Sequence, residues 1–256
     1  MTINNAIFIT VRTSSTRLPK KCLLEISGKP TIVHLIHRVK EARLADGIVL
    51  CTTTNPEDDI LCQIATREGI SFFRGSEKDK LERWRGAAAK YHVAFFVTAD
   101  GDDLFCEPEL IDLAFKQYAK TGVDFIESAN LACGAFTYGI KVAALNKVCE
   151  IKNTDDTEMM WVYFTQTGRF QCAPLRDVPA VFVRPEIRMT LDYEDDFQFF
   201  KNIIEHFLRL NKTAFSLRDI LAYLDAHPEV ARINQHRQQE FLDNQKKKTK
   251  LVLRAE

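Results

Sequence analysis

Short apolar runs alternate with amphipathic segments along the first half of the chain. In 31–43, apolar residues recur at the spacing of one helical face. The run 93–98 is apolar throughout, which is typical of a central strand covered on both faces. This alternation predicts βαβ units and a doubly wound, mostly parallel α/β sheet. Strands are predicted at 6–11, 47–52, 71–73, 93–98 and 123–126, and helices at 31–43, 56–68, 79–91 and from 107 onward.

The second half is less regular. Residues 128–185 mix glycine and aromatic residues with one short helical pattern, and we interpret them as an inserted subdomain for dimerisation or acceptor binding. The alternation then resumes with a predicted strand at 186–191 and a helix at 194–210. Further helices are expected within 212–250. The 256 residues fit one domain, 1–256, that carries this insertion.

Composition excludes several partners. The chain has 35 basic and 35 acidic residues, so it lacks the basic face with which nucleic-acid binders displace counterions. The same balance argues against a surface for anionic membranes. Neither a signal peptide nor a membrane-spanning apolar stretch is recognisable, and the seven scattered cysteines are typical of buried reduced thiols. We therefore expect a cytoplasmic protein with no nucleic-acid or membrane partner.

In open α/β sheets, ligands bind beyond the carboxyl ends of the strands. The first such position holds Arg12–Lys21, which packs four cations and four hydroxyl side chains into one loop. A triphosphate carries about four negative charges, and guanidinium and ammonium groups with backbone N–H groups can meet them. The glycine patterns of P-loop NTPases and of dinucleotide-binding folds are absent. Taken alone, the loop is equally compatible with an ordinary exposed basic turn.

Carboxylates follow two later predicted strands. Asp100, Asp102 and Asp103 come after 93–98, and Asp192 comes after 186–191. Several carboxylates at one place repel unless a cation joins them, and Mg²⁺ takes one or two carboxylates together with phosphate oxygens and water. A solvated acidic turn is the alternative for the first group. Asp192 precedes the following helix, so it can reach the same cavity.

Three motifs together resemble a known family. Arg12-x-Ser-Ser-Thr-Arg-Leu-Pro-Lys-Lys21 with Gly28-Lys-Pro30, then 98–112, then Arg188-Met-Thr-Leu-Asp192, is similar to the cytidylyltransferases related to spore coat polysaccharide biosynthesis protein F. That group belongs to the acylneuraminate and CMP-Kdo synthetase superfamily. The resemblance implies a Rossmann-like, nucleotide-diphospho-sugar transferase fold. Lys20 stands where the family often has glycine, and Asp100 where it usually has threonine.

The resemblance also implies roles for residues. Arg12, Ser15, Arg17 and Lys21 would hold the CTP phosphates, and Asp102 and Asp192 would bind Mg²⁺. Arg12, Lys21, Asp102 and Asp192 are thus the expected catalytic residues. The full expected nucleotide-binding set is Arg12, Thr13, Ser14, Ser15, Arg17, Lys21, Thr52, Arg74, Gly75, Ser76 and Asp79.

These features predict a Mg²⁺-dependent cytidylyltransferase that joins CMP to a sugar or sugar-acid acceptor in surface glycan synthesis. Relatives often form homodimers, so we expect one here. A phosphate or phosphonate acceptor, a nucleotide-sugar glycosyltransferase that uses Asp100-Gly-Asp102, and an inert binding protein are the alternatives. Lys141, Arg184 and Arg188 are candidates for pairing with an acidic acceptor, although structural ion pairs are at least as compatible with each.

Overall fold

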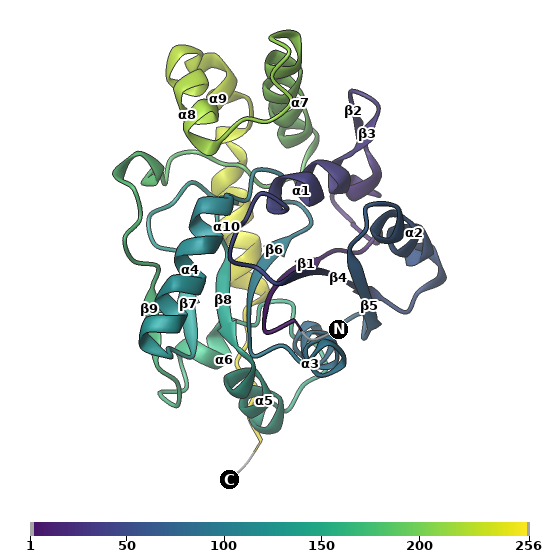
Figure 1. Ribbon diagram of the computed structural model, residues 1–256, viewed down its shortest axis with the longest axis vertical. Coiled ribbons are helices and arrows are strands. Elements are labelled where there is room, and N and C mark those ends of the chain that lie inside the picture. Colours follow the sequence, from purple (N-terminus) through teal and green to yellow (C-terminus); the bar gives the residue numbers. More distant parts are fainter. Residues whose placement is uncertain (1–2, 255–256) are drawn as a thin grey trace.

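The computed structural model describes residues 3–254. Its centre is a seven-stranded sheet, and all of its strands run in the same direction except β8 (Figure 1). The strands are β1 (Asn5–Thr10), β4 (Gly47–Thr53), β5 (Ser71–Gly75), β6 (Phe95–Asp100), β7 (Phe125–Glu127), β8 (Tyr138–Lys141) and β9 (Cys172–Pro174). Across the sheet they lie in the order β5-β4-β1-β6-β8-β7-β9, and β2 (Glu25–Ile26) and β3 (Lys29–Pro30) form a separate hairpin.

Helices cover both faces of the sheet (Figure 1). The α-helices are α1 (Thr31–Val39), α2 (Asp59–Arg67), α3 (Lys80–Tyr91), α4 (Pro108–Thr121), α5 (Val142–Ile151), α6 (Val162–Thr165), α7 (Glu194–Arg209), α8 (Leu217–Ala226), α9 (Pro228–Gln235) and α10 (Arg237–Lys248). Short 3-10 helices lie at Lys21–Leu23, Pro56–Asp58 and Ala180–Phe182.

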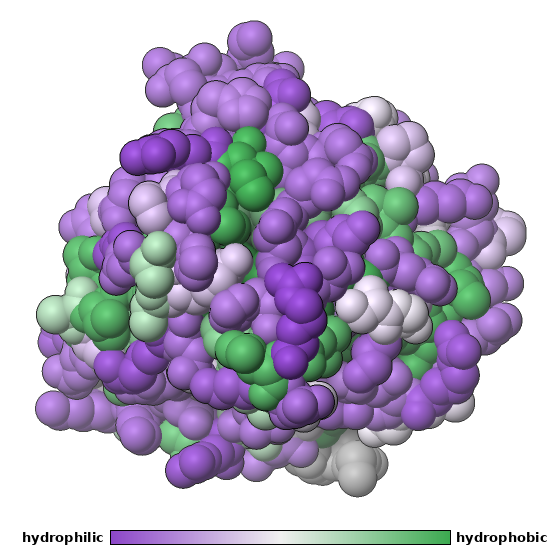
Figure 2. All heavy atoms as spheres, turned by 90° about the horizontal axis from the view of Figure 1, so that it is seen from above, coloured by the Kyte–Doolittle hydropathy of each residue, from purple (hydrophilic) through white to green (hydrophobic). Residues whose placement is uncertain are grey.

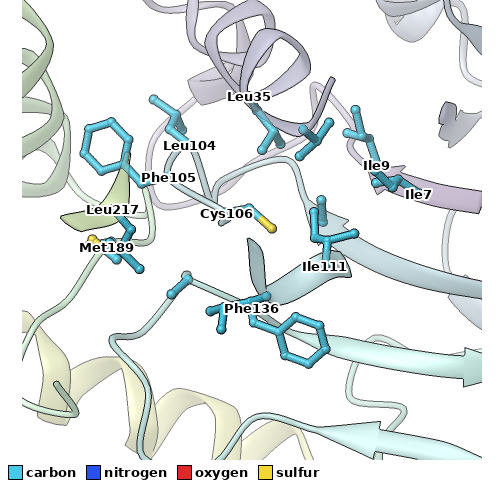
Figure 3. Close-up of a cluster of buried hydrophobic side chains, with 14 of the residues drawn as sticks. Ile7, Ile9, Leu35, Leu104, Phe105, Cys106, Ile111, Phe136, Met189 and Leu217 are labelled. Atoms are coloured by element: carbon cyan, nitrogen blue, oxygen red, sulfur yellow. The ribbon is translucent and has the colours of Figure 1, made fainter. Parts of the chain in front are cut away.

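The alternation of side chains along β1 divides the core in two. Ile7 and Ile9 face a cluster that also takes in the apolar sides of α1, α2, α4, α7 and α8. Ala6 and Phe8 face the other cluster, which is built with α3, α5 and α6. Figure 3 shows part of the first cluster, which includes residues as far apart in sequence as Ile7 and Leu217. Burial on both faces explains why these strands are almost wholly apolar.

The doubly wound, mostly parallel sheet predicted from the sequence is confirmed. Residues 128–185, which the sequence predicted to form an inserted subdomain, extend the central sheet. Strand β8 pairs with β6 and β7, and β9 pairs with β7. Apolar side chains of this segment, such as Ile140 and Phe164, pack into the core cluster built with α3, α5 and α6. A role of the segment in dimerisation or acceptor binding stays a prediction.

The strand predicted at 186–191 is wrong. Alternate residues there are apolar and buried, as in a strand, but the chain pairs with the central region only through a bridge between Cys133 and Arg188. Two main-chain hydrogen bonds join it to Cys133, from Cys133 N to Ile187 O and from Met189 N to Cys133 O, and another runs from Leu191 N to the carbonyl of Asp102. The segment is extended because it passes between buried groups, and not because it pairs with a neighbouring strand.

No helix within residues 3–254 is long and apolar enough to cross a membrane. The face seen from above in Figure 2 is mostly hydrophilic, and its apolar atoms lie in small separate patches. All seven cysteines are free, and five of them are buried. Burial raises the pKa of the Cys51 thiol to about 12, so this thiol stays protonated at neutral pH.

Candidate active site

The register of the sheet brings two of the sequence motifs together. Thr10, at the end of β1, lies beside Asp100, at the end of β6. The cationic loop leaves β1 at the same edge at which the acidic turn leaves β6. Between them opens a cleft of about 840 Å³, lined by both segments and by residues from the second half of the chain. The carboxyl-end rule for open α/β sheets therefore holds here.

Lys21 joins the two carboxylates that the sequence singled out. Its Nζ lies 2.6 Å from Oδ2 of Asp102 and 2.7 Å from Oδ1 of Asp192, although the two aspartates are 90 positions apart in the sequence. Arg17 lies on the other side, with Nη2 2.5 Å from the same Oδ1 of Asp192. The structure thus brings Asp102, Asp192, Arg17 and Lys21 into one contiguous group that faces the cleft.

Main-chain contacts explain why Asp192 reaches this group. The N–H of Leu191 donates to the carbonyl of Asp102 over 2.9 Å, which places the two segments side by side. Behind them, the buried Arg188 guanidinium makes a two-pronged ion pair with Asp196, at 2.8 and 3.0 Å. Oδ2 of Asp196 also accepts the N–H groups of Asp192 and Tyr193. Arg188 and Asp196 therefore fix the turn that carries Asp192.

The charges of the group stabilise one another. Burial alone would raise the pKa of Asp192, but Lys21 and then Arg17 lower it below the usual carboxyl value. Burial alone would lower the pKa of Lys21, but Asp102 and Asp192 raise it above its ordinary value. Asp192 is therefore ionised and Lys21 protonated over the whole physiological pH range.

The residues present fit a divalent ion. Two carboxylates from distant segments meet at one point, and hard oxygen ligands of this kind are those that Mg²⁺ prefers. Oδ2 of Asp192 is buried and accepts no hydrogen bond from residues 3–254, and Nη2 of Arg188 lies 3.5 Å from it. Within the described chain no three potential ligands gather. An ion held here would complete its coordination with phosphate oxygens and water, as Mg²⁺ commonly does.

The rest of the cationic loop also borders the cleft. Arg12, Ser14 and Ser15 line it, and Nη1 of Arg12 donates to the carbonyl of Glu77 over 3.1 Å. Lys20 has φ 50° and ψ 32°, the left-handed conformation that glycine adopts without strain. This explains the glycine that the resembling family often has at that position. The loop accepts lysine there at a cost of about 1–2 kcal/mol in backbone energy.

Two residues expected to bind nucleotide are buried behind the loop instead. Thr13 donates both its N–H and its hydroxyl to Oδ1 of Asp58, at 2.8 and 2.7 Å. The hydroxyl of Thr52 donates to Oδ2 of the same carboxylate over 3.0 Å. Neither residue lines the cleft. Asp58, which sequence reasoning passed over, thus fastens the base of the cationic loop to β4.

The predicted stretch 74–79 also serves internal contacts. Arg74 is paired with Asp59 and donates to two main-chain carbonyls. Gly75 packs against Arg83, and the hydroxyl of Ser76 accepts the N–H of Asp79. Asp79 caps α3 and makes a buried ion pair with Lys152. Arg74, Gly75, Ser76 and Asp79 lie outside the cleft lining, whereas Glu77, Lys78 and Lys80 belong to it.

The candidates for an acidic acceptor are engaged elsewhere. Lys141 pairs with Asp124, and Arg184 pairs with Glu186 and Asp225. Arg188 supports the Asp192 turn from within the core. Asp100 faces Lys80, with Nζ 3.6 Å from its Oδ1. The rest of the cleft lining comes from residues within 128–138, from Glu158, Met159 and Thr190, and from α10. No sequence motif singled out α10.

The cleft thus presents two carboxylates beside Arg12, Arg17 and Lys21. Such a site can hold a polyphosphate through the cations while the carboxylates hold a metal on the same phosphates. Phosphoryl-type transfer needs this kind of positioning and charge stabilisation, and it requires little covalent participation from the protein. The geometry is therefore that of a nucleotidyl-transfer site.

Known proteins give the same assignment. Residues 6–247 match the family model described as cytidylyltransferase. The chain is 25% identical over 236 residues to the spore coat polysaccharide biosynthesis protein SpsF of Bacillus subtilis, covering 90% of this chain and 98% of that one. The structure of a cytidylyltransferase from Leptospira borgpetersenii superposes with a TM-score of 0.80 at 24% identity, over 90% of this chain and 97% of that one.

A more distant likeness shows the fold alone. The structure of a CMP:2-keto-3-deoxy-manno-octonic acid synthetase complexed with CTP matches with a TM-score of 0.61 at 13% identity, over 79% of this chain and 99% of that one. The family match spans most of the chain and includes both halves of the cleft. The chain therefore belongs to the cytidylyltransferase family of CTP-dependent nucleotidyltransferases.

Proposed function

We propose that this enzyme transfers CMP from CTP to a hydroxyl group of a sugar or sugar-acid acceptor in the synthesis of a surface glycan precursor. The observation that carries the proposal is the single group formed by Asp102, Asp192, Arg17 and Lys21 in one cleft. The names of relatives support the acceptor class, because they include a spore coat polysaccharide protein and a synthetase for a keto-deoxy sugar acid.

In the proposed reaction, the acceptor oxygen forms a bond to the α-phosphorus of CTP, and its hydroxyl proton passes to the surrounding water. The bond from that phosphorus to the oxygen bridging the α- and β-phosphates breaks, and pyrophosphate leaves with the electron pair. Arg12, Arg17 and Lys21 neutralise the charge of the departing group. Asp102 and Asp192 would hold Mg²⁺, which supplies Lewis-acid polarisation of the phosphate oxygens when bound. Lys21 then exchanges its carboxylate partners for phosphate oxygens.

Three further properties belong to the same proposal. The preference for Mg²⁺ follows from the oxygen ligands. A homodimeric assembly and a cytoplasmic location are supported by the family resemblance and by the composition. The nucleotide is held by the cationic loop and by the 77–80 segment, and not by Thr13, Thr52 or Arg74, because these residues are engaged behind the cleft.

The test is pyrophosphate release with each of the four ribonucleoside triphosphates and a panel of sugar acids, neutral sugars, sugar phosphates and phosphonates. We expect release with CTP and Mg²⁺ and at least one acceptor. Asp192→Asn should lower the rate about a hundredfold or more, because it removes a charge-stabilising contact. Glu194→Gln changes an exposed carboxylate two residues away and should leave the rate unchanged. Sugar transfer from a nucleotide sugar without pyrophosphate release would contradict the proposal.

A further inference from the structure

Helix α10 forms a wall of the cleft although it has no buried residue. In Figure 1 it runs along the molecule from the group of α7, α8 and α9 toward the C-terminal end. A helix so polar gains little from the hydrophobic effect, so its position must depend on specific contacts.

Such contacts hold the chain on both sides of the helix middle. At its start, Nε of Arg237 lies 2.8 Å from Oδ2 of Asp195, and the Arg188 guanidinium stacks 4.6 Å from the centre of the Phe241 ring. Beyond its end, the N–H of Val252 donates to the Tyr163 hydroxyl over 3.2 Å. The N–H of Arg254 donates to the carbonyl of Ile151 over 2.9 Å. Contacts at its start and beyond its end thus hold α10 in place across the cleft.

One face of α10 is turned to the cleft. Gln238, Phe241, Gln245 and Lys248 recur at the spacing of a single helical face, and all four line it. Gln239, on another face, is exposed and donates to Asp243. On the cleft-facing side, Gln238 and Gln245 are half-buried, whereas Lys248 is exposed.

The chemistry of this face is that of neutral hydrogen bonding. The half-buried Gln245 side chain has no hydrogen-bond partner among residues 3–254, and Gln238 uses only its oxygen, which accepts from Arg188 over 3.3 Å. Each amide carries both donors and an acceptor. Lys248 is opposed by Glu158, with 3.6 Å between the charged atoms, and Arg12 faces the same carboxylate at 3.9 Å. The wall thus offers amide groups with unused hydrogen-bonding capacity and the Phe241 ring. Its cation Lys248 shares the carboxylate of Glu158 with Arg12.

We propose that this face of α10 binds the uncharged, hydroxyl-rich body of the acceptor, with Gln238 and Gln245 as specificity-determining residues. The inference rests on the proposed function in that the bound molecule is the CMP acceptor. Hydroxyl groups both donate and accept, as amides do, so a polyol can use both the donors and the acceptor of each amide, whereas a carboxylate can use only the donors. The acceptor's reacting hydroxyl would then point toward Asp102 and Asp192, while α10 holds the rest of the molecule.

Saturation-transfer NMR on the full chain tests this directly. The probes are a neutral N-acetylhexosamine, a 3-deoxy-2-keto sugar acid and glycerol phosphate, each titrated in the presence of CTP and Mg²⁺. We expect the neutral sugar to bind, and Gln245→Ala to weaken its binding about three- to tenfold, as for one lost hydrogen bond between uncharged groups. Gln239→Ala removes the same side chain from the outer face of the same helix and should bind as the wild type does.

Several results would overturn the inference. These are failure of the neutral sugar to bind the wild type, equal binding by Gln245→Ala and the wild type, and binding of the sugar acid alone. The rise in melting temperature with CTP, measured on the same samples, reports on the proposed function separately. Sugar binding that depends on Gln245 in a protein that ignores CTP would contradict the proposed function and leave the inference standing. CTP binding without sugar binding that depends on Gln245 would contradict the inference and leave the proposed function standing.

Discussion

Gly134 lies where two segments distant in sequence pass very close to each other. Its φ is +90°, and a Cβ atom there would lie 2.0 Å from the main-chain oxygen of Met189 and 3.0 Å from Oδ1 of Asp103. No side chain fits between those atoms. Because Met189 precedes Asp192 by only three residues, this contact sets how near the second carboxylate comes to the first.

We therefore expect Gly134→Ala to destabilise the fold by about 3 kcal/mol or more, because backbone strain and a main-chain clash add. Gly168→Ala is the matched control: its φ is +67°, but a Cβ there would meet nothing within 4 Å. It should cost only the strain, about 1–2 kcal/mol. Denaturant unfolding of both variants measures the difference. Equal losses in the two would show that the close approach at Met189 does not constrain the fold.

The sequence predicted the charged residues of the cleft better than it predicted which groups the hydroxyl side chains contact. Arg17, Lys21, Asp102 and Asp192 follow from charged motifs at strand ends, and the structure brings them together. Thr52 was expected to face the nucleotide because of the family resemblance. The local sequence does not reveal that a buried carboxylate takes up this hydroxyl, since that pairing depends on tertiary contacts.

Among the elements, the 3-10 helix Pro56–Asp58 has a structural role although it is only three residues long. Asp58 accepts hydrogen bonds from Thr13, Thr52 and Thr53, so it joins the cationic loop to the end of β4. Burial alone would raise the pKa of this carboxyl, but the hydrogen bonds from Thr53, Thr13 and Thr52 lower it below its usual value. The ionised form is therefore the one that the fold stabilises.

This predicts a specific dependence of stability on pH. Because the folded-state pKa of Asp58 is depressed, its contribution is fully present above the unfolded pKa of about 3.9 and is lost as the pH falls through the lower folded value. Asp58→Asn should be less stable at pH 7 and should lose less of its remaining stability than the wild type between about pH 4 and pH 2. Urea unfolding across that range measures both slopes. Parallel slopes would show that Asp58 does not contribute to the acid sensitivity.

The order of the elements was predictable because short apolar runs and helical patterns are strong in the first half of the chain. The stretch 186–191 was mistaken for a strand because its apolar residues alternate with polar ones, although all of 187–191 are buried and no ladder forms there. The addition of β8 and β9 to the central sheet was missed for a related reason. Short strands that pair with distant neighbours leave little periodic signal.

For the whole molecule, a zero formal net charge coexists with a dense local group of charges. Ordinary α/β topology produces it, because the ends of β1 and β6 meet and the 188–196 segment closes over them. In the structure, Lys21 neutralises the two carboxylates from the same side on which a substrate polyphosphate would lie. The central claim is that Asp102 and Asp192 bind a divalent ion together once CTP has drawn Lys21 away.

Binding of Mn²⁺ in the presence of CTP, followed by electron paramagnetic resonance, tests that claim most directly. The wild type and the Glu194→Gln control should bind Mn²⁺ equally. Asp102→Asn and Asp192→Asn should each weaken binding by at least about tenfold, since each removes one of two protein ligands. Wild-type affinity for Mn²⁺ in both aspartate variants, with CTP still bound, would contradict the account.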